Sequence, residues 1–199
     1  MKQEYRAGLP AVSPKQVAVA LTREIPAYFT PEEVKAILQS ARTPRDHLLI
    51  NLLWQTGARI SELLALKVED IDFYAKTVRL PCLKRKKRPY RVLPLKDGLI
   101  GELGAYIGQR GLRRDDRLFK ITRERAWQIV KETCRRAGMD RERSHPHTFR
   151  HSFAVYCVLN HVPILVLKDW LGHSNIASTL VYLKILSSDT RQFYEALQF

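Results

Sequence analysis

The chain has 199 residues, of which 45% are hydrophobic, enough for one large domain or for a main domain with a small appendage. Its 34 Lys and Arg residues against 20 Asp and Glu residues give a formal net charge of +14, and such a field attracts polyanions, nucleic acid first among them. No apolar run approaches the ~18 residues that span a bilayer, and the N-terminus lacks the apolar core of a signal peptide, so we expect a cytoplasmic protein away from membranes.

The first segment is punctuated by Gly8, Pro10 and Pro14, which predicts that residues 1–24 form an arm or linker. The letters TPEEV, from Thr30, are typical of a helix N-terminus, with a Thr cap, Pro at the first position and acids that suit the helix dipole. A second helix is predicted from about Pro44 to Gly57.

A third helix is predicted directly after Gly57, with Leu63, Leu64 and Leu66 facing inward. The pattern then changes to that of strands over residues 71–73, 77–80 and 90–93, with a basic hairpin between the last two. After Leu99 the chain is predicted to be helical to its end. We therefore expect a mainly α fold with a small antiparallel β-sheet, an α+β class. The helical breaks are predicted at Gly111, Gly138, Pro146, Pro163 and Gly172.

The three cysteines are odd in number and never occur as C-x-x-C, which argues against both a disulfide framework and a zinc ribbon. We expect buried thiols at Cys82, Cys134 and Cys157.

The stretch SHPHTFRHSFAVYCVLN predicts a helix that starts at Pro146 and places His147 and Arg150 on one face near its N-terminus. Its buried face is expected to be the apolar stripe of Phe149, Phe153, Tyr156 and Leu159. An imidazole and a guanidinium there can bind an anion with help from the dipole, although a solvated basic face is the simpler interpretation. His147 and His151 have the spacing of zinc-binding histidines, but Thr148 occupies the place of the catalytic Glu and no third ligand is evident.

Two further stretches each allow a structural and a functional interpretation. In TGARISE, Arg59 can pair with Glu62 or can bind a phosphate with both arms of its guanidinium. In KRKKRPYR, residues 84–91, six of eight residues are basic, typical of a solvated charge run or of a hairpin tip that enters a DNA groove.

The stretch LGHSNIASTLVY places His173 after a helix that ends at Gly172, with Ser174 or Asn175 capping a last long helix that carries Tyr182. Taken alone, this tyrosine is either a core aromatic with a wet hydroxyl or a nucleophile.

Together, TGAR, the basic hairpin, HPHTFRH, LGH and the late tyrosine resemble the catalytic domain of the tyrosine recombinase, or phage integrase, family, most nearly its Xer-like bacterial members. The resemblance runs from about Tyr28 to Leu186 in the family's order and roughly its spacing. It implies a tyrosine recombinase catalytic-domain fold over residues 25–186, with residues 187–199 as a C-terminal tail. The family usually has a helical core-binding domain before this one, and here only the arm of residues 1–24 stands before it, so we expect either the catalytic domain of a longer protein or one of the short single-domain members.

The resemblance also implies a role for each motif. The scissile phosphate would be held by Arg59 and Arg150, with His147 as a proton-transfer and hydrogen-bonding group beside it and His173 completing the shell. Tyr182, nine residues after His173, would be the nucleophile. Counting back from RVLPL places the hairpin lysine, the acid for the departing 5′-oxygen, at Lys86. The remaining basic residues expected to contact DNA are Lys84, Arg85, Lys87, Arg88 and Arg91.

A phenol with a pKa of ~10 needs a neighbouring base or a concentrated positive field to attack at neutral pH, and two arginines, two histidines and a lysine supply that field. The resemblance therefore implies a site-specific DNA recombinase that works through a 3′-phosphotyrosyl intermediate and needs no metal or other cofactor. Its partner would be double-stranded DNA, on which it would assemble as a tetramer from free monomers, and accessory DNA-binding proteins are further candidate partners. The alternatives are DNA relaxation of the type IB topoisomerase kind and a non-catalytic DNA-binding regulator.

The tail carries an apolar stripe at helical spacing, which must be buried on the chain's own core or, as in resembling family members, on a neighbouring protomer. The stripe comprises Phe193, Tyr194 and Leu197, and Phe199 can extend it.

Overall fold

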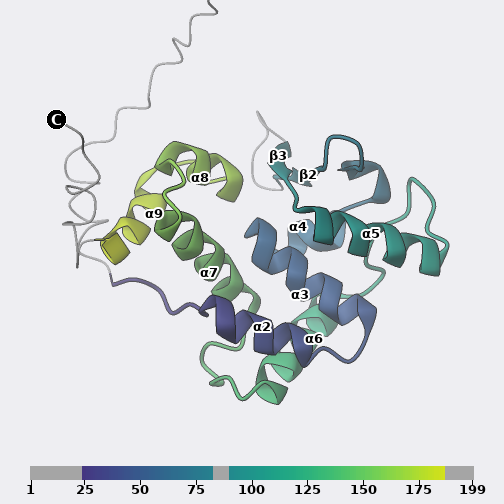
Figure 1. The fold of residues 1–199 in the computed structure, drawn as a ribbon, viewed down its shortest axis with the longest axis horizontal. Coiled ribbons are helices and arrows are strands. Elements are labelled where there is room, and N and C mark those ends of the chain that lie inside the picture. Colours follow the sequence, from purple (N-terminus) through teal and green to yellow (C-terminus); the bar gives the residue numbers. More distant parts are fainter. Residues whose placement is uncertain (1–23, 83–89, 187–199) are drawn as a thin grey trace, which may run out of the picture.

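The computed structural model describes residues 24–82 and 90–186 (Figure 1). Its α-helices are α2 (Pro31–Gln39), α3 (Pro44–Thr56), α4 (Ile60–Ala65), α5 (Asp97–Arg110), α6 (Arg123–Arg136), α7 (Pro146–Leu159), α8 (Ile164–Leu171) and α9 (Ala177–Leu180). The 3₁₀ helices are η1 (Val68–Asp70) and η2 (Val181–Leu186), and the strands are β1 (Ile71–Asp72), β2 (Thr77–Pro81) and β3 (Tyr90–Pro94). The expected class, mainly α with one small antiparallel sheet, is confirmed. The predictions for the arm, for residues 84–88 of the hairpin and for the tail lie outside the described residues.

Local signals set the ends of the first helices. The Thr30 hydroxyl accepts a hydrogen bond from the Glu33 backbone N–H, and the Glu33 carboxylate accepts one from the Thr30 N–H, so both ends of a capping box are present. Helix α3 ends at Gly57, which has a left-handed backbone with φ of 57°. A side chain at this position would also meet Phe153, because an added Cβ would lie 2.5 Å from its ring.

The sheet has the strand order β1-β2-β3, and both pairs are antiparallel. Leu80 of β2 lies opposite Arg91 of β3, and on β3 the buried positions alternate with exposed ones. Leu93 therefore points inward, as a half-buried strand requires. Arg91 occupies the other buried position of β3, where an apolar residue is the usual choice.

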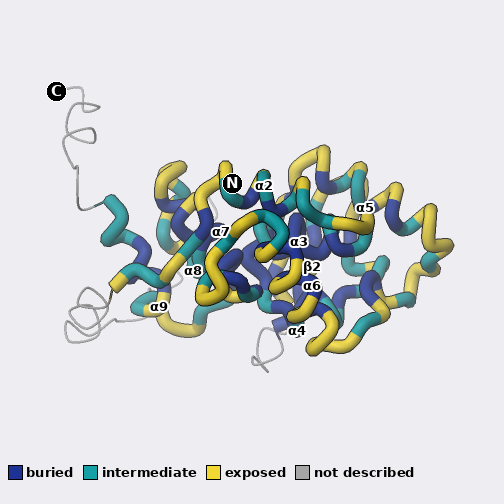
Figure 2. Tube along the Cα trace, turned by 90° about the horizontal axis from the view of Figure 1, so that it is seen from below, coloured by how far each residue is buried: buried dark blue, intermediate teal, exposed yellow. Residues whose placement is uncertain are grey.

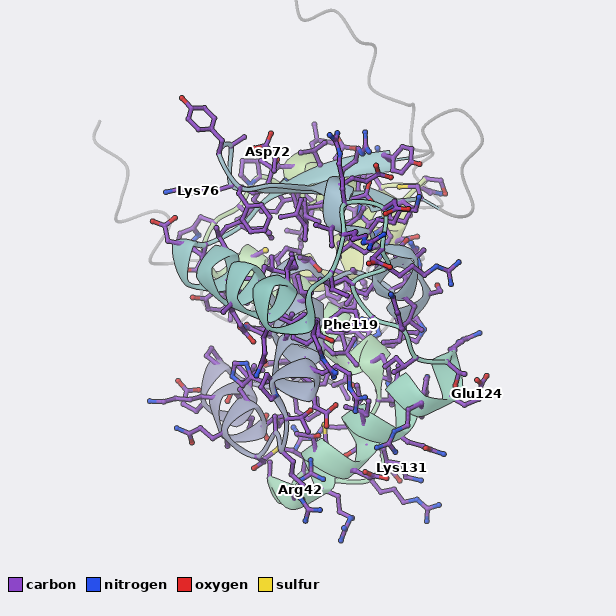
Figure 3. All side chains as sticks on the ribbon, turned by 90° about the vertical axis from the view of Figure 1, so that its right-hand side faces the viewer. Arg42, Asp72, Lys76, Phe119, Glu124 and Lys131 are labelled. Atoms are coloured by element: carbon purple, nitrogen blue, oxygen red, sulfur yellow. The ribbon has the colours of Figure 1, made fainter. Side chains whose placement is uncertain are left out.

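Helix α3 lies at the centre of the fold and contacts α2, α4, α5, α6 and α7 (Figure 2). Its leucine and isoleucine residues face in several directions and are fully buried, as is typical of a helix surrounded by others. They are Leu48, Leu49, Ile50, Leu52 and Leu53. Figure 3 shows Phe119 pointing into the interior, whereas the basic side chains of Arg42 and Lys131 extend outward at one end of the molecule. The three cysteines are buried, as expected. Within the described ranges, no helix is long and apolar enough to cross a membrane.

The C-terminal part differs from expectation in two places. The apolar stripe of α7 is buried at Phe149 and Phe153, but Tyr156 and Leu159 are 43% and 48% exposed because the end of the helix reaches the surface. The predicted last long helix is instead the single turn of α9 followed by the 3₁₀ helix η2. This tighter winding goes with burial of Tyr182 in η2, which packs against α7.

Candidate functional site

Arg150 is the most deeply buried of the site arginines, with 4% of its surface exposed. It lies one turn into α7, whose first residue is Pro146 as predicted. Its Nη1 donates to the Gly57 carbonyl at 2.7 Å, and its Nη2 donates to the Leu171 carbonyl at 2.6 Å. These carbonyls close α3 and α8, where helices leave C=O groups without partners and carry partial negative charge. Two helix ends therefore hold this guanidinium in place.

The charge of Arg150 persists in this setting. Burial, and then the positive charges of Arg59 and Arg91, lower the pKa of its guanidinium to about 9. The side chain therefore stays cationic at neutral pH. A buried cation that is already oriented is suited to bind an anion without reorganisation.

Arg59 is the residue directly before α4, at the junction that the sequence pattern singled out. Its Nη1 donates to Glu62 Oε1 at 2.9 Å, and its backbone N–H donates to Glu62 Oε2 at 2.8 Å. The pairing with Glu62 that the sequence allowed is thus present. The charge of Arg59 also lowers the pKa values of Arg150 and His147, which places its guanidinium within electrostatic reach of both.

The two predicted histidines, His147 and His173, lie at the helix ends expected for them. His147 is in the first turn of α7, where burial and then the charge of Arg150 lower its pKa, so its ring is neutral at pH 7. His173 follows the left-handed Gly172 that ends α8, and its Nδ1 is hydrogen-bonded to Thr179 Oγ1 at 2.8 Å.

Tyr182 is 2% exposed, and its hydroxyl lies 2.7 Å from Nδ1 of His151. Burial, opposed by the charge of Arg150, raises the pKa of Tyr182 to about 12. Burial and the charges of His147, Arg150 and His145 lower the pKa of His151 to about 4. At neutral pH the ring is neutral and the phenol protonated, so the bond forms with the hydroxyl donating to Nδ1. In this state the phenol is neither ionised nor open to solvent.

The hydrogen bond of His151 was not foreseen from the sequence, which considered this residue only as a zinc ligand four positions after His147. Over the described parts of the chain, no group of three or more His, Cys, Asp or Glu residues is arranged to hold a metal ion. The sequence offers one signal for the pairing of His151 with Tyr182, which is that His151 follows Arg150 directly. The spacing of residues does not reveal a contact between side chains 31 residues apart.

Arg91, expected from the sequence to contact DNA, is buried in this structure. Its side chain is 7% exposed and is used internally, with Nη2 donating to Glu62 at 2.7 Å and Nε donating to the Trp170 carbonyl at 2.6 Å. The reason is its position on β3, where alternation turns residue 91 inward while Tyr90 and Val92 face outward. Lys84, Arg85, Lys86, Lys87 and Arg88 lie outside the described residues.

Comparison with known proteins shows the family of this chain. The model of the Phage integrase family matches residues 27–188. A tyrosine recombinase of Pseudothermotoga lettingae is 37% identical over 174 residues, which are 85% of this chain and 60% of that protein. This chain therefore spans about 60% of the length of that curated relative.

Among solved structures, XerA recombinase has a TM-score of 0.75 and 24% identity, over 89% of this chain and 68% of that one, a likeness of fold. XerH recombinase, crystallised bound to its difH substrate before cleavage, has a TM-score of 0.73 and 25% identity, over 87% of this chain and 54% of that one. With the family match covering most of its length, this chain belongs to the phage integrase family, the family of the tyrosine recombinases.

Proposed function

We propose that this chain is the catalytic part of a site-specific DNA recombinase that cleaves and rejoins DNA through Tyr182. The observation that carries the proposal is the buried Arg150, oriented by the ends of α3 and α8, with Arg59 and Tyr182 within electrostatic reach of it. A fixed cation of this kind suits a phosphodiester, whose non-bridging oxygens gain charge in the transition state. The family membership and the DNA-bound XerH structure support the same substrate.

In the proposed reaction the phosphate binds to Arg59 and Arg150, with His147 and His173 beside it. The Tyr182 hydroxyl leaves His151, loses its proton to a neighbouring base such as the neutral His147, and attacks phosphorus. The new O–P bond to tyrosine forms as the bond to the 5′-oxygen breaks, and Lys86 protonates that oxygen. The 3′-phosphotyrosyl link keeps the phosphodiester energy, so a 5′-hydroxyl of another strand can reverse the step without ATP or a further cofactor.

The test uses DNA flanking the gene, cloned into a supercoiled plasmid, and a nicked suicide duplex made from the same sequence. We expect a covalent protein–DNA adduct at the 3′ end that forms in EDTA and disappears in Tyr182→Phe. Relaxation of plasmids with and without that DNA would instead favour a topoisomerase. Binding of the duplex without any adduct would favour a DNA-binding regulator. An adduct that persists in Tyr182→Phe would exclude this tyrosine as nucleophile.

We also propose that four protomers assemble on DNA through the C-terminal tail. An apolar cavity of about 410 Å³, between α3, α7, α8 and the end of β3, is a candidate receptor for the tail of a neighbouring protomer. Trp54, Phe153, Tyr156 and Trp170 are among the residues that line it, and the tail carries a matching apolar stripe. Truncation after Ser188 should leave covalent cleavage but abolish synapsis, as measured by gel mobility of paired duplexes. Unfolding of the truncated monomer would instead indicate that the tail docks on its own core.

A further inference from the structure

The buried arginine of strand β3 joins three parts of the chain that are distant in sequence. Besides its bonds to Glu62 and to the Trp170 carbonyl, Arg91 directs Nη1 to the Cys82 sulfur at 3.6 Å. It also packs against Gly172, where an added Cβ would lie 3.3 Å from Arg91 Cδ. Arg91 thus contacts α4, the end of β2 and the turn that precedes His173.

Glu62 lies between two arginines in this arrangement and is 1% exposed. Its Oε1 accepts from the Arg59 guanidinium, and its Oε2 accepts from Arg91 and from the Arg59 backbone N–H. Burial opposes ionisation of this carboxyl, but the hydrogen bonds and charges of Arg91 and Arg59 outweigh it and hold its pKa below the usual range. The carboxylate is therefore charged, and its charge is shared between both guanidinium groups.

This sharing has a consequence for Arg59. A carboxylate that faces one arginine tends to engage it with both oxygens, which uses two N–H groups of the fork and offsets its charge. With Arg91 on Oε2, the Arg59 side chain meets Glu62 through Nη1 and Oε1. The three residues together keep a formal charge of +1, since two cations surround one anion.

Arg91 and Arg150 also act on neighbouring carbonyls at the end of α8. Arg91 binds the carbonyl of Trp170, and Arg150 binds that of Leu171. These are among the C-terminal C=O groups that a helix cannot satisfy internally. The turn carrying His173 is therefore fixed from two sides, by one arginine of the phosphate site and by one arginine outside it.

We propose that Arg91 is a positioning residue for the scissile phosphate: by taking the second oxygen of Glu62 and the Trp170 carbonyl, it keeps Arg59 turned toward the phosphate and holds the His173 turn beside Arg150. The inference rests on the proposed function, because the phosphate in question is the one that Tyr182 attacks. It assigns to Arg91 a role inside the protein in place of a contact with DNA.

The first test needs no DNA. In a crystal structure of the full chain with Arg91→Gln, we expect the Arg59 guanidinium to bind both oxygens of Glu62. Arg59 remaining on Oε1 alone would overturn the inference, whether or not the chain proves to be a recombinase. Arg91→Lys, which keeps the buried charge but not the fork of donors, serves the same test if the Gln variant does not fold.

The second test measures single-turnover cleavage of the suicide duplex at saturating protein. Arg91→Gln should slow cleavage of the phosphodiester by about 10- to 100-fold, the scale expected for misplaced catalytic groups. With an uncharged methylphosphonate at the scissile position, the loss should shrink to about 3-fold or less, because a neutral group gains less from a well-placed cation. An equal loss on both substrates would reveal a general structural defect and refute positioning.

Arg79→Gln is the matched control. Arg79 lies on the adjacent strand β2 and pairs with Asp70, but its side chain is 51% exposed. We expect its cleavage rate to stay within about 2-fold of the wild type, because exposed ion pairs contribute little. If the wild-type chain forms no adduct at all, the proposed function fails, and the structure of the DNA-free variant still decides whether Arg91 positions Arg59.

Discussion

The pairing of His151 with Tyr182 predicts how the stability of this protein depends on pH. The folded ring has a pKa of about 4, whereas an unfolded histidine titrates near 6.5. Between these values the unfolded chain binds a proton that the folded chain does not. The unfolding free energy must therefore fall as the pH drops from 6.5 to 4, and the contribution of His151 is complete above pH 6.5.

The size of this effect follows from the difference between the two pKa values. A lowering from 6.5 to about 4 corresponds to at most about 3 kcal/mol of folding free energy. The ring is only partly buried, and screening by solvent reduces the expected effect to about 2 kcal/mol. That is a large share of the total stability of a domain of this size.

The assay is urea unfolding between pH 7 and pH 4, followed by tryptophan fluorescence, on the wild type and on His151→Asn. The Asn side-chain oxygen can replace Nδ1 as acceptor for the Tyr182 hydroxyl but does not titrate. His145, His147 and Glu62 titrate in both proteins, so their contributions cancel in the difference. We expect the stability of His151→Asn to fall by about 2 kcal/mol less than that of the wild type. Equal losses in the two proteins would refute this reasoning.

Gly57→Ala should lower the unfolding free energy by about 2–4 kcal/mol, because the backbone there is left-handed and the added methyl would clash with Phe153. Urea unfolding measures this loss. Gly101→Ala is the control and should cost no stability, because its site is open. Lys86→Ala should slow cleavage while leaving DNA affinity nearly unchanged, and a 5′-bridging phosphorothiolate, whose thiolate leaves without a proton, should restore its rate. If the phosphorothiolate instead restores the cleavage rate of Lys84→Ala, the general acid is Lys84. Lys84→Ala is otherwise expected to weaken binding to all sequences and to lower the salt slope by about one unit in anisotropy titrations.

Much of the local structure could be predicted from the sequence because its signals act over a few residues. The capping box at Thr30, the left-handed glycines at Gly57 and Gly172, and the proline that starts α7 each fix a helix end through contacts within one turn. The strands followed from alternation in the same way. These signals were sufficient for the fold class, and the order of the motifs was sufficient for the family.

Interpretation from the sequence was wrong where a pattern extended past its physical cause. The apolar stripe of α7 continues to Tyr156 and Leu159 in the sequence, but these two side chains are exposed. Burial stops where the helices packed against α7 end, and the sequence of α7 does not encode that point. The helix expected to carry Tyr182 is shortened to a single turn and a 3₁₀ segment, because packing against α7 outweighs helical propensity over so few residues.

The sequence by itself determined which residue types and motifs this protein has and where its helices and strands begin. Only the tertiary structure decided what those residues contact. Arg91 belongs to a basic run in the sequence, yet strand alternation and an acidic partner 29 residues away turn it into the interior. The sequence allowed Tyr182 to be either a nucleophile or a core aromatic. In this structure its phenol is buried and hydrogen-bonded to His151, 31 residues away. The physical reason is common to both: a buried polar group must find a partner, and the partner is selected by the packing of distant elements, which no local pattern encodes.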